Sequence, residues 1–223
     1  MKTIKNLGLE NSLFNQFISE IRSVEVQKDS MRFRRNLERM GEIFAYEISK
    51  TFAYKPTEVV TPLGTKVVPL MEEQPVLATI LRAGLPLHQG MLNYFDRADN
   101  AFISAFRKHY MDGTFEIQID YMSSPELEDR ILIICDPMLA TGQSMIYTYN
   151  EIVSKGKPKY VHIVSAIASQ QGINYLQDNL PDVGCSIWIG AVDEELTAQS
   201  YIVPGLGDAG DLAFGCKTDS FFS

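Results

Sequence analysis

Apolar residues between positions 33 and 52 recur every three or four residues, a spacing that places them along one face of an amphipathic helix. They are Phe33, Leu37, Met40, Phe44, Ile48 and Phe52. Asp29 or Ser30 is placed to cap the start of this helix. Arginines and glutamates share its other positions, a mixture more typical of a solvated or subunit-facing surface than of an anion site. Residues 1–56 are therefore predicted to form an N-terminal helical extension.

Beyond Pro62 the apolar residues gather in short runs rich in β-branched and aromatic side chains, which indicate buried strands. The predicted strands are 76–81, 101–106, 131–135, 160–167 and 185–192, and helices are predicted between them at 86–95, 144–155 and 171–179. Because strands and helices alternate, the pattern predicts an α/β fold with a mostly parallel twisted sheet flanked by helices. Ligands of such sheets bind at the carboxyl ends of the strands.

One interval interrupts this alternation. Residues 107–125 contain Asp112-Gly113, a hairpin-turn dipeptide, between segments of β-forming residues. They predict a β-hairpin flap beside the sheet, which is either a lid over a site or a plain surface hairpin. The 223 residues as a whole are predicted to form a single domain.

Composition and charge exclude several classes of protein. With 45% hydrophobic and 22% charged residues, the chain can build a large core. A net charge of −8 argues against a protein that binds nucleic acid backbones. No run of about 18 apolar residues and no secretory leader is present, so neither a membrane partner nor export is expected and the cytoplasm is predicted. Cys135, Cys185 and Cys216 lack paired spacing and are interpreted as reduced thiols.

The first candidate site follows the predicted strand 131–135. Asp136 stands at the end of that strand, and Ala140-Thr141-Gly142-Gln143-Ser144 then opens a helix. Backbone N–H groups at a helix start, with the hydroxyls of Thr141 and Ser144, suit a phosphate, and Gly142 lets the backbone approach closely. Asp136 could accept hydrogen bonds from a sugar diol. A simple helix cap is the alternative, and a triphosphate-binding P-loop is disfavoured because no lysine follows the glycine.

Two arginines occupy similar places at other strand ends. Arg82 follows strand 76–81, and Arg107 follows strand 101–106. A guanidinium there can present several donors to a diphosphate. An isolated arginine at a strand end is usually a surface charge, but two beside a phosphate loop favour a diphosphate site.

A glycine-rich segment near the carboxyl end is the third candidate. Gly205, Gly207 and Gly210 match the spacing of a dinucleotide-binding fingerprint, yet only 13 residues follow Gly210, too few for the helix and strand that this motif requires. The alternatives are a structural loop and a loop whose backbone approaches a flat ligand.

Together, the segments 80–85 (ILRAGL), 136–144 (DPMLATGQS) and 201–211 (YIVPGLGDAGD) resemble the three signatures of the uracil phosphoribosyltransferase family, in the same order. The segments 193–196 and 33–46 also resemble that family. The resemblance implies a type I phosphoribosyltransferase fold and transfer of phosphoribosyl from 5-phospho-α-D-ribose 1-diphosphate (PRPP) to uracil, giving UMP and diphosphate in pyrimidine salvage. It implies Mg²⁺ bound to PRPP rather than a protein-held metal.

The same resemblance assigns roles to individual residues. PRPP would be bound by Arg82, Arg107, Asp136, Pro137, Met138, Leu139, Ala140, Thr141, Gly142, Gln143, Ser144 and Asp208. Uracil would be bound by Ile202, Gly207, Asp208 and Ala209 within a loop region spanning 193–216. Asp208, Asp136 and Arg107 are the expected catalytic residues. A homodimer or higher homo-oligomer is expected, with GTP a candidate allosteric activator.

The chain departs from the family pattern at three points. Gln143 replaces the second glycine of the phosphate loop, the segment 85–90 lacks an acid near Gln89, and Lys108-His109 stands where an acidic pair is expected. These differences bear on phosphate affinity and on nucleotide regulation. Two other functions remain as alternatives: a non-catalytic PRPP-binding regulator, and a phosphoribosyltransferase for another nucleobase.

Overall fold

A sheet of eight strands runs through the middle of the protein. The computed structural model describes residues 2–109, 115–181 and 184–216. The strands lie in the order β1 (Thr3–Asn6), β10 (Cys185–Asp193), β9 (Tyr160–Ser169), β7 (Ile131–Cys135), β4 (Val76–Leu81), β5 (Asp99–His109) and β6 (Phe115–Ser123), and β8 (Met138–Leu139) pairs with β9. All pairs are parallel except β5 with β6. The predicted α/β class with a mostly parallel sheet is confirmed.

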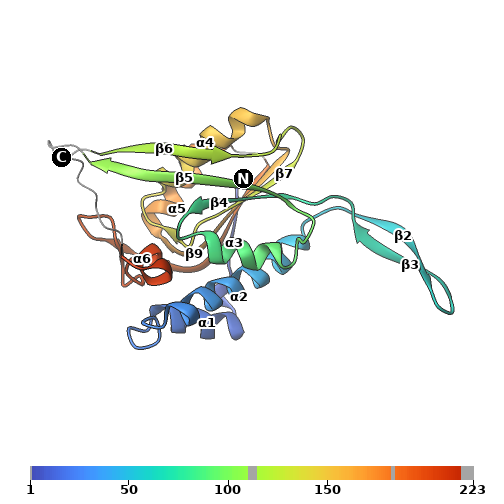
Figure 1. Cartoon of the computed structure of the whole chain (residues 1–223), viewed down its shortest axis with the longest axis horizontal. Coiled ribbons are helices and arrows are strands. Elements are labelled where there is room, and N and C mark those ends of the chain that lie inside the picture. Colours follow the sequence, from blue (N-terminus) through green and yellow to red (C-terminus); the bar gives the residue numbers. More distant parts are fainter. Residues whose placement is uncertain (1, 110–114, 182–183, 217–223) are drawn as a thin grey trace.

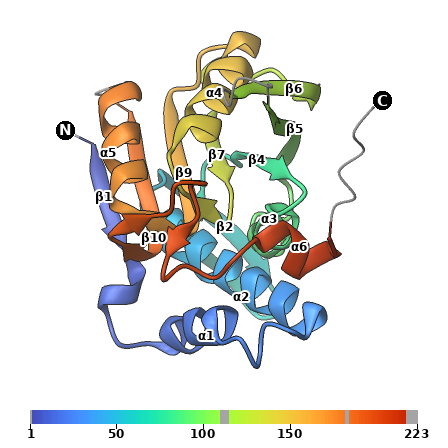
Figure 2. The same cartoon turned by 90° about the vertical axis from the view of Figure 1, so that its left-hand side faces the viewer.

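Helices cover both faces of this sheet (Figures 1 and 2). The helices are α1 (Leu13–Arg22), α2 (Ser30–Ser49), α3 (Leu85–Leu92), α4 (Gln143–Ile152), α5 (Gln170–Asn179) and α6 (Ala209–Phe214), with 3₁₀ turns η1 (Leu7–Leu9) and η2 (Val153–Lys155). Because successive side chains of a strand point to opposite faces of the sheet, β7 contributes to two apolar clusters, one on each face. Ile133 packs with α2, whereas Leu132 and Ile134 pack with α4 and α5.

The helix α2 confirms the predicted apolar stripe. Its members from Phe33 to Ile48 are at most 1% exposed. The Asp29 carboxylate accepts hydrogen bonds from the backbone N–H groups of Met31 and Arg32, so it caps the helix as expected. Two of the arginines of α2 form ion pairs with glutamates, Arg32 with Glu20 and Arg35 with Glu38 and Glu42. These contacts agree with the interpretation of a mixed-charge surface.

Several elements were not predicted from the sequence, among them a projecting pair of strands and the helix α1. The strands β2 (Tyr54–Thr61) and β3 (Gly64–Met71) pair with each other and project from the body as an arm, residues 54–71 (Figure 1). Neither face of the arm is buried, so it has no apolar alternation to detect. The helix α1 does carry a signal, because Ser12 just before it and Asn15 in its first turn form a capping box.

The predicted flap corresponds to β5 and β6, which pair antiparallel up to His109 and Phe115. Its predicted turn, Asp112-Gly113, lies outside the described residues. The flap's role as a lid therefore stays a prediction. No helix in the three described ranges is both long enough and apolar enough to cross a membrane.

A close crossing of α2 and α3 yields a stability prediction. A Cβ atom on Gly90 would lie 1.9 Å from the backbone oxygen of Glu38. Alanine favours a helix by about 1 kcal/mol over glycine, but this clash with backbone should outweigh that gain. We expect Gly90→Ala to lower the free energy of unfolding by about 1–3 kcal/mol in urea titrations. Gln89→Ala, at an exposed position of the same helix, is the control and should change it by about 0.5 kcal/mol or less. A Gly90→Ala protein as stable as wild type would contradict the tight crossing.

Candidate active site

The parallel neighbours β4 and β7 bring two of the predicted site residues to one edge of the sheet. Thr79 lies opposite Cys135, so Arg82 and Asp136 both follow the carboxyl ends of adjacent strands. The chain turns sharply after β4, since a Cβ atom on Gly84 would lie 2.1 Å from Thr79 Oγ1. The glycine therefore allows the loop bearing Arg82 to fold over the strand end.

The segment after β7, residues 136–142, is held from behind and is called the cradle loop below. The Ser165 hydroxyl donates to the backbone oxygen of Asp136 at 2.8 Å, and the Ser169 hydroxyl donates to that of Ala140 at 2.5 Å. The Ser169 oxygen also accepts a hydrogen bond from Gly172 N at 2.8 Å, which caps α5. Loop carbonyls that would repel a phosphate are thereby turned toward β9 and α5.

The cradle loop ends where α4 begins. Gly142, the residue before α4, adopts a left-handed φ of +79° and supplies no side-chain acceptor to the first turn. Because N–H groups in the first turn of a helix have no partner within the helix, they remain suited to an anion. The Thr141 hydroxyl lies 3.4 Å from the backbone nitrogen of Gln143. The assignment of a phosphate to this helix start stays a prediction.

Asp136 is surrounded by protein on most sides and keeps only a partly exposed edge. Burial raises the pKa of Asp136 to about 7; a hydrogen bond from the Met138 backbone opposes this shift, and the charge of Asp208 adds to it. The electrostatic influence of Asp208 shows that the second and third signature segments approach each other in space.

Arg82 joins the first signature to the third. Its Nη2 atom lies 3.2 Å from Asp211 Oδ1 and 3.3 Å from the backbone oxygen of Gly215. A Cβ atom on Gly210 would lie 3.2 Å from Asp208 Oδ1 and 3.7 Å from Arg82 Nη2. Arg82, Asp136 and Asp208 are therefore neighbours, although they lie far apart in the sequence.

The remaining predicted residues divide into three groups. Ile202 and Ala209 are buried, whereas Gly207 has a left-handed φ of +95° and faces open space, since nothing lies within 4 Å of where its Cβ would be. Arg107 is on β5, opposite Ile117, but its side chain lies outside the described residues. The assignment of Arg107 to the site therefore stays a prediction.

Residues 9–216 match the family model described as uracil phosphoribosyltransferase. The chain belongs to the uracil phosphoribosyltransferase family. A uracil phosphoribosyltransferase of Porphyromonas gingivalis (strain ATCC 33277) is 53% identical over 212 residues, covering 95% of this chain and 98% of that relative. One from Methanothermobacter thermautotrophicus is 38% identical and covers 95% of each chain. The structure of the AQ2163 protein from Aquifex aeolicus matches with a TM-score of 0.84 at 31% identity, covering 96% of this chain and 98% of that one.

Gln143, which departs from the pattern of the uracil phosphoribosyltransferase family, has an unusual environment. Its side-chain oxygen is buried, and no group within the described ranges donates a hydrogen bond to it. An unpaired buried amide oxygen costs about 1–3 kcal/mol. This oxygen therefore has capacity for a donor from a bound ligand at the start of α4.

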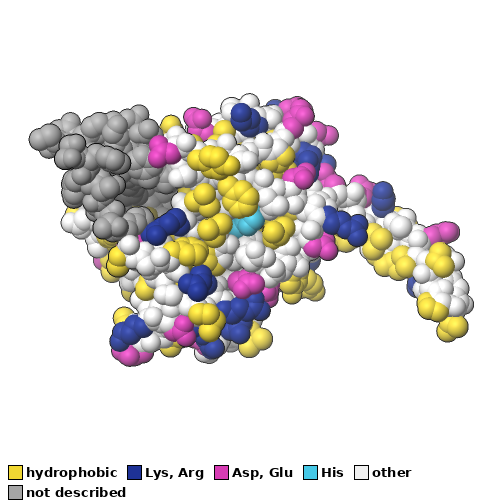
Figure 3. All heavy atoms as spheres, viewed as in Figure 1, with side chains coloured by type: hydrophobic (Ala, Val, Ile, Leu, Met, Phe, Trp, Pro, Cys, Tyr) yellow, Lys and Arg dark blue, Asp and Glu magenta, His cyan; other side chains and the backbone are white. Residues whose placement is uncertain are grey.

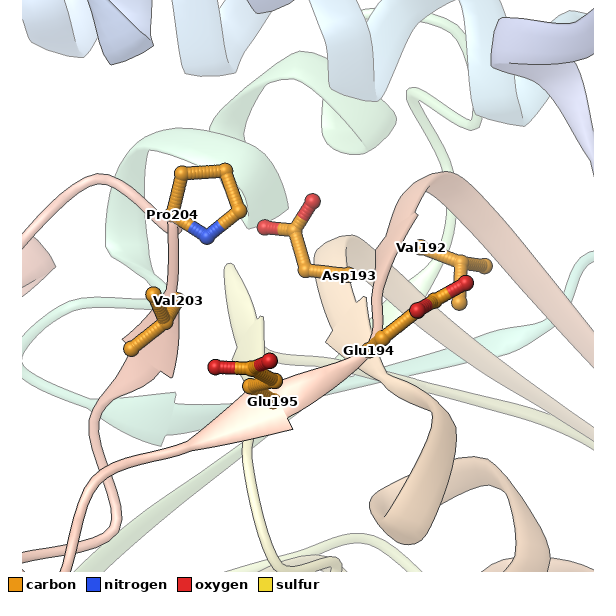
Figure 4. A pocket seen from close by; sticks show the side chains of 6 residues that line it. All are labelled: Val192, Asp193, Glu194, Glu195, Val203 and Pro204. Atoms are coloured by element: carbon orange, nitrogen blue, oxygen red, sulfur yellow. The ribbon is translucent and has the colours of Figure 1, made fainter.

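A pocket of about 400 Å³ adjoins the glycine-rich segment. It is lined by Val192, Asp193, Glu194, Glu195, Val203 and Pro204, and Figure 4 shows the Asp193 carboxylate directed toward Pro204. None of the four predicted uracil-binding residues is among the six. The carboxylates of Glu194 and Glu195 would repel phosphates, and Asp193 is already paired with Arg22, so this pocket does not suit PRPP. The convergence of Arg82, Asp136 and Asp208 marks the better candidate.

Sequence reasoning missed the residues that support the cradle loop from behind. Ser169 stands just before the predicted helix 171–179, so its capping role has a recognisable signal. Its bond to Ala140 has none, because the two residues meet only through the pairing of β8 with β9. Ser165 likewise lies inside the predicted strand 160–167, and nothing in the sequence indicates its contact with Asp136. The sequence thus indicates the residues of the loop that are expected to contact a ligand, but not the residues that hold the loop in place.

The raised pKa of Asp136 predicts a stability effect that depends on pH. Because the folded-state pKa of about 7 exceeds the ordinary 3.8, the folded protein binds this proton more tightly than the unfolded chain. The contribution of this group to the free energy of unfolding is therefore largest below about pH 4 and is lost as the pH rises through 7. We expect Asp136→Asn, which carries no charge, to melt about 2–8 °C above wild type at pH 8.

The difference in melting temperature should shrink steadily between pH 7 and pH 4, as measured by differential scanning fluorimetry across this range. Asp178→Asn, which changes an exposed carboxylate on α5, is the matched control. A constant difference between Asp136→Asn and wild type at all pH values would contradict the buried, destabilised carboxylate.

Proposed function

We propose that this protein catalyses transfer of the phosphoribosyl group from PRPP to uracil, forming UMP and diphosphate. The observation that carries the proposal is the convergence of Arg82, Asp136 and Asp208 at one sheet edge, in a member of the uracil phosphoribosyltransferase family. Each of these residues belongs to a different signature segment. Their convergence supports a single site with phosphate, ribose and base subsites.

The proposed roles follow from the chemistry of each group. The cradle loop and the start of α4 hold the 5′-phosphate, Asp136 accepts hydrogen bonds from the ribose hydroxyls, and Arg82 with Arg107 binds the diphosphate. Displacement at the anomeric carbon passes through an oxocarbenium-like state, so positioning and stabilisation of the leaving diphosphate carry the catalysis. The exposed backbone at Gly207, with Ile202, Asp208 and Ala209, meets the base.

Arg82 must exchange partners for this role. In the structure its guanidinium hydrogen-bonds Asp211 and the Gly215 backbone oxygen. Its side chain is 39% exposed, so it can turn toward a diphosphate without unpacking a core. A diphosphate offers bidentate, doubly charged acceptors that compete well with one carboxylate. We therefore assign Arg82 to the diphosphate subsite.

No covalent nucleophile is needed. Burial raises the pKa of Cys135 to about 12, so this thiol stays protonated at neutral pH. All three cysteines are unpaired. Unpaired thiols are typical of a reducing compartment, which supports our placement of the reaction in the cytoplasm.

Mg²⁺ enters this proposal with the substrate. Within the described ranges, no three His, Cys, Asp or Glu side chains converge to hold a metal ion. Magnesium is commonly held by substrate phosphates with one or two carboxylates, and Asp136 and Asp208 are the carboxylates near the proposed diphosphate. The ion would neutralise charge that develops on the leaving group.

The central prediction concerns turnover. Wild type should form UMP from uracil and PRPP with Mg²⁺, and excess EDTA should abolish the reaction. We expect Asp208→Asn to lower kcat by about 100-fold or more, measured by chromatographic detection of UMP. Its fold should survive because asparagine also caps a helix, as Asp208 caps α6. Asp178→Asn is the control with wild-type kcat.

The same assay separates the alternatives. Calorimetric binding of PRPP without any UMP would favour the non-catalytic regulator, and faster turnover of another base in competition would favour the other transferase. Adding GTP tests the candidate activator, since a rise in rate at fixed substrate would support it. A wild-type rate in well-folded Asp208→Asn would refute the role of that residue.

We further propose that the protein is a homodimer or higher homo-oligomer, joined through the arm. Val60 is 84% exposed and Leu63 is 100% exposed. Figure 3 shows hydrophobic side chains along this projection, where the body of the protein does not cover them. An extended apolar hairpin in water favours a partner that buries it, and a second copy of the chain is always available to do so.

A charge on the arm should weaken that association. We expect Leu63→Asp to lower the molar mass measured by light scattering after size exclusion, because an apolar contact would then bury a carboxylate. Glu58→Gln, an exposed polar position of the same arm, is the control that should keep the wild-type mass. An unchanged assembly in Leu63→Asp, or a monomeric wild type, would contradict the proposal.

A further inference from the structure

The backbone of Gly205 is held on both of its hydrogen-bonding groups by one ion pair. Its N–H donates to Asp193 Oδ2 at 3.0 Å, and its oxygen accepts from Arg22 Nη1 at 2.9 Å. Arg22 also meets Asp193 in a bidentate contact, with both distances 2.8 Å. Asp193 is 7% and Arg22 22% exposed, so the network is largely shielded from water.

A second contact fastens the next residue. Gln27 Nε2 donates to the backbone oxygen of Leu206 at 3.2 Å and to that of Ile21 at 3.0 Å. The chain turns tightly here, since Gly205 has a left-handed φ of +55° and a Cβ atom there would lie 2.1 Å from the backbone oxygen of Ile202. The end of α1 and the loop after it thus hold residues 205–206 by side-chain hydrogen bonds to their backbone oxygens.

This support matters because of how the base is read in the proposed function. Residues 201–208, called the base loop here, present backbone groups and few polar side chains. Where backbone atoms recognise a ligand, the conformation of the loop decides which hydrogen-bond pattern fits. A small displacement of the base loop therefore alters recognition even though no contacting residue changes.

We propose that Arg22 and Asp193 are positioning residues for base recognition, whose ion pair fixes the base loop at Gly205. The proposal rests on the proposed transfer to uracil. Arg22 comes from α1 and Asp193 from the end of β10, so the pair connects the N-terminal helices to the site. Removing one partner leaves the other charge shielded and uncompensated, and it frees one backbone group of Gly205.

The chain offers a matched control. Arg32 binds Glu20 in another bidentate pair, at 2.7 and 2.9 Å, which also involves α1. Among the described residues, the hydrogen-bond partners of Glu20 are Gln16, Arg32 and Asn36, none of which belongs to the base loop. Loss of the Arg32 pair reports the general cost of breaking an arginine–carboxylate bridge on α1, whereas loss of the Arg22 pair adds the effect on the loop.

The kinetic test compares Arg22→Gln and Asp193→Asn with Arg32→Gln. We expect the first two variants to raise the KM for uracil about 10- to 100-fold while the KM for PRPP changes by about twofold or less. Their preference for uracil over cytosine in competition should fall, and Arg32→Gln should behave as wild type in each measurement. Equal changes in both KM values, or none, would overturn the proposal.

Amide hydrogen exchange in the substrate-free protein gives an independent readout. Peptides covering residues 203–208 should exchange faster in Arg22→Gln than in wild type or Arg32→Gln. If wild type forms no UMP, the proposed function fails, yet the exchange still tests whether the pair holds the loop. If Arg22→Gln does not fold, Arg22→Lys keeps the charge and loses the bidentate fork, with the same results expected. Unchanged exchange in the folded variant would refute the positioning role.

Discussion

The parallel pairing of β4 with β7 is the constraint on which the site depends. With Thr79 opposite Cys135, Arg82 and Asp136 emerge at one edge, and a slip of one residue would turn every side chain of a strand to the other face. Each strand contributes to both apolar clusters, one shared with α2 and the other with α4 and α5. The two helical layers therefore fix the register, and the register places the chemistry.

The groups gathered at that edge oppose stability. Above pH 7 the carboxylate of Asp136 carries a charge that its burial and the charge of Asp208 both disfavour. The side-chain oxygen of Gln143 is buried without a hydrogen-bond donor in the described structure. Each is a cost that a purely structural strand end would avoid. A substrate that brings hydroxyl donors and a bound cation, as the proposed function implies, would offset these costs, so groups that lower stability would strengthen binding.

Much of the fold was predictable, and the reasons are local. The strands at 76–81 and 131–135 match in both bounds because continuous apolar runs are buried on both faces. The arm escaped prediction because neither of its faces is buried, so burial imposes no pattern on residues 54–71. The candidate site stood out in the signature segments, and its ligand assignments stay predictions. Its supports, such as Ser169 behind Ala140, did not stand out, because long-range contacts leave no spacing in the sequence.

The two halves of the site are supported in different ways. The cradle loop is held by Ser165 and Ser169 of β9, each of which lies 29 residues beyond its partner in the loop. The base loop is held across 171 residues by Arg22 and Asp193. Under the function proposed above, the two subsites therefore have separate supports, since Arg22 and Asp193 bond the base loop while Ser165 and Ser169 bond the cradle loop.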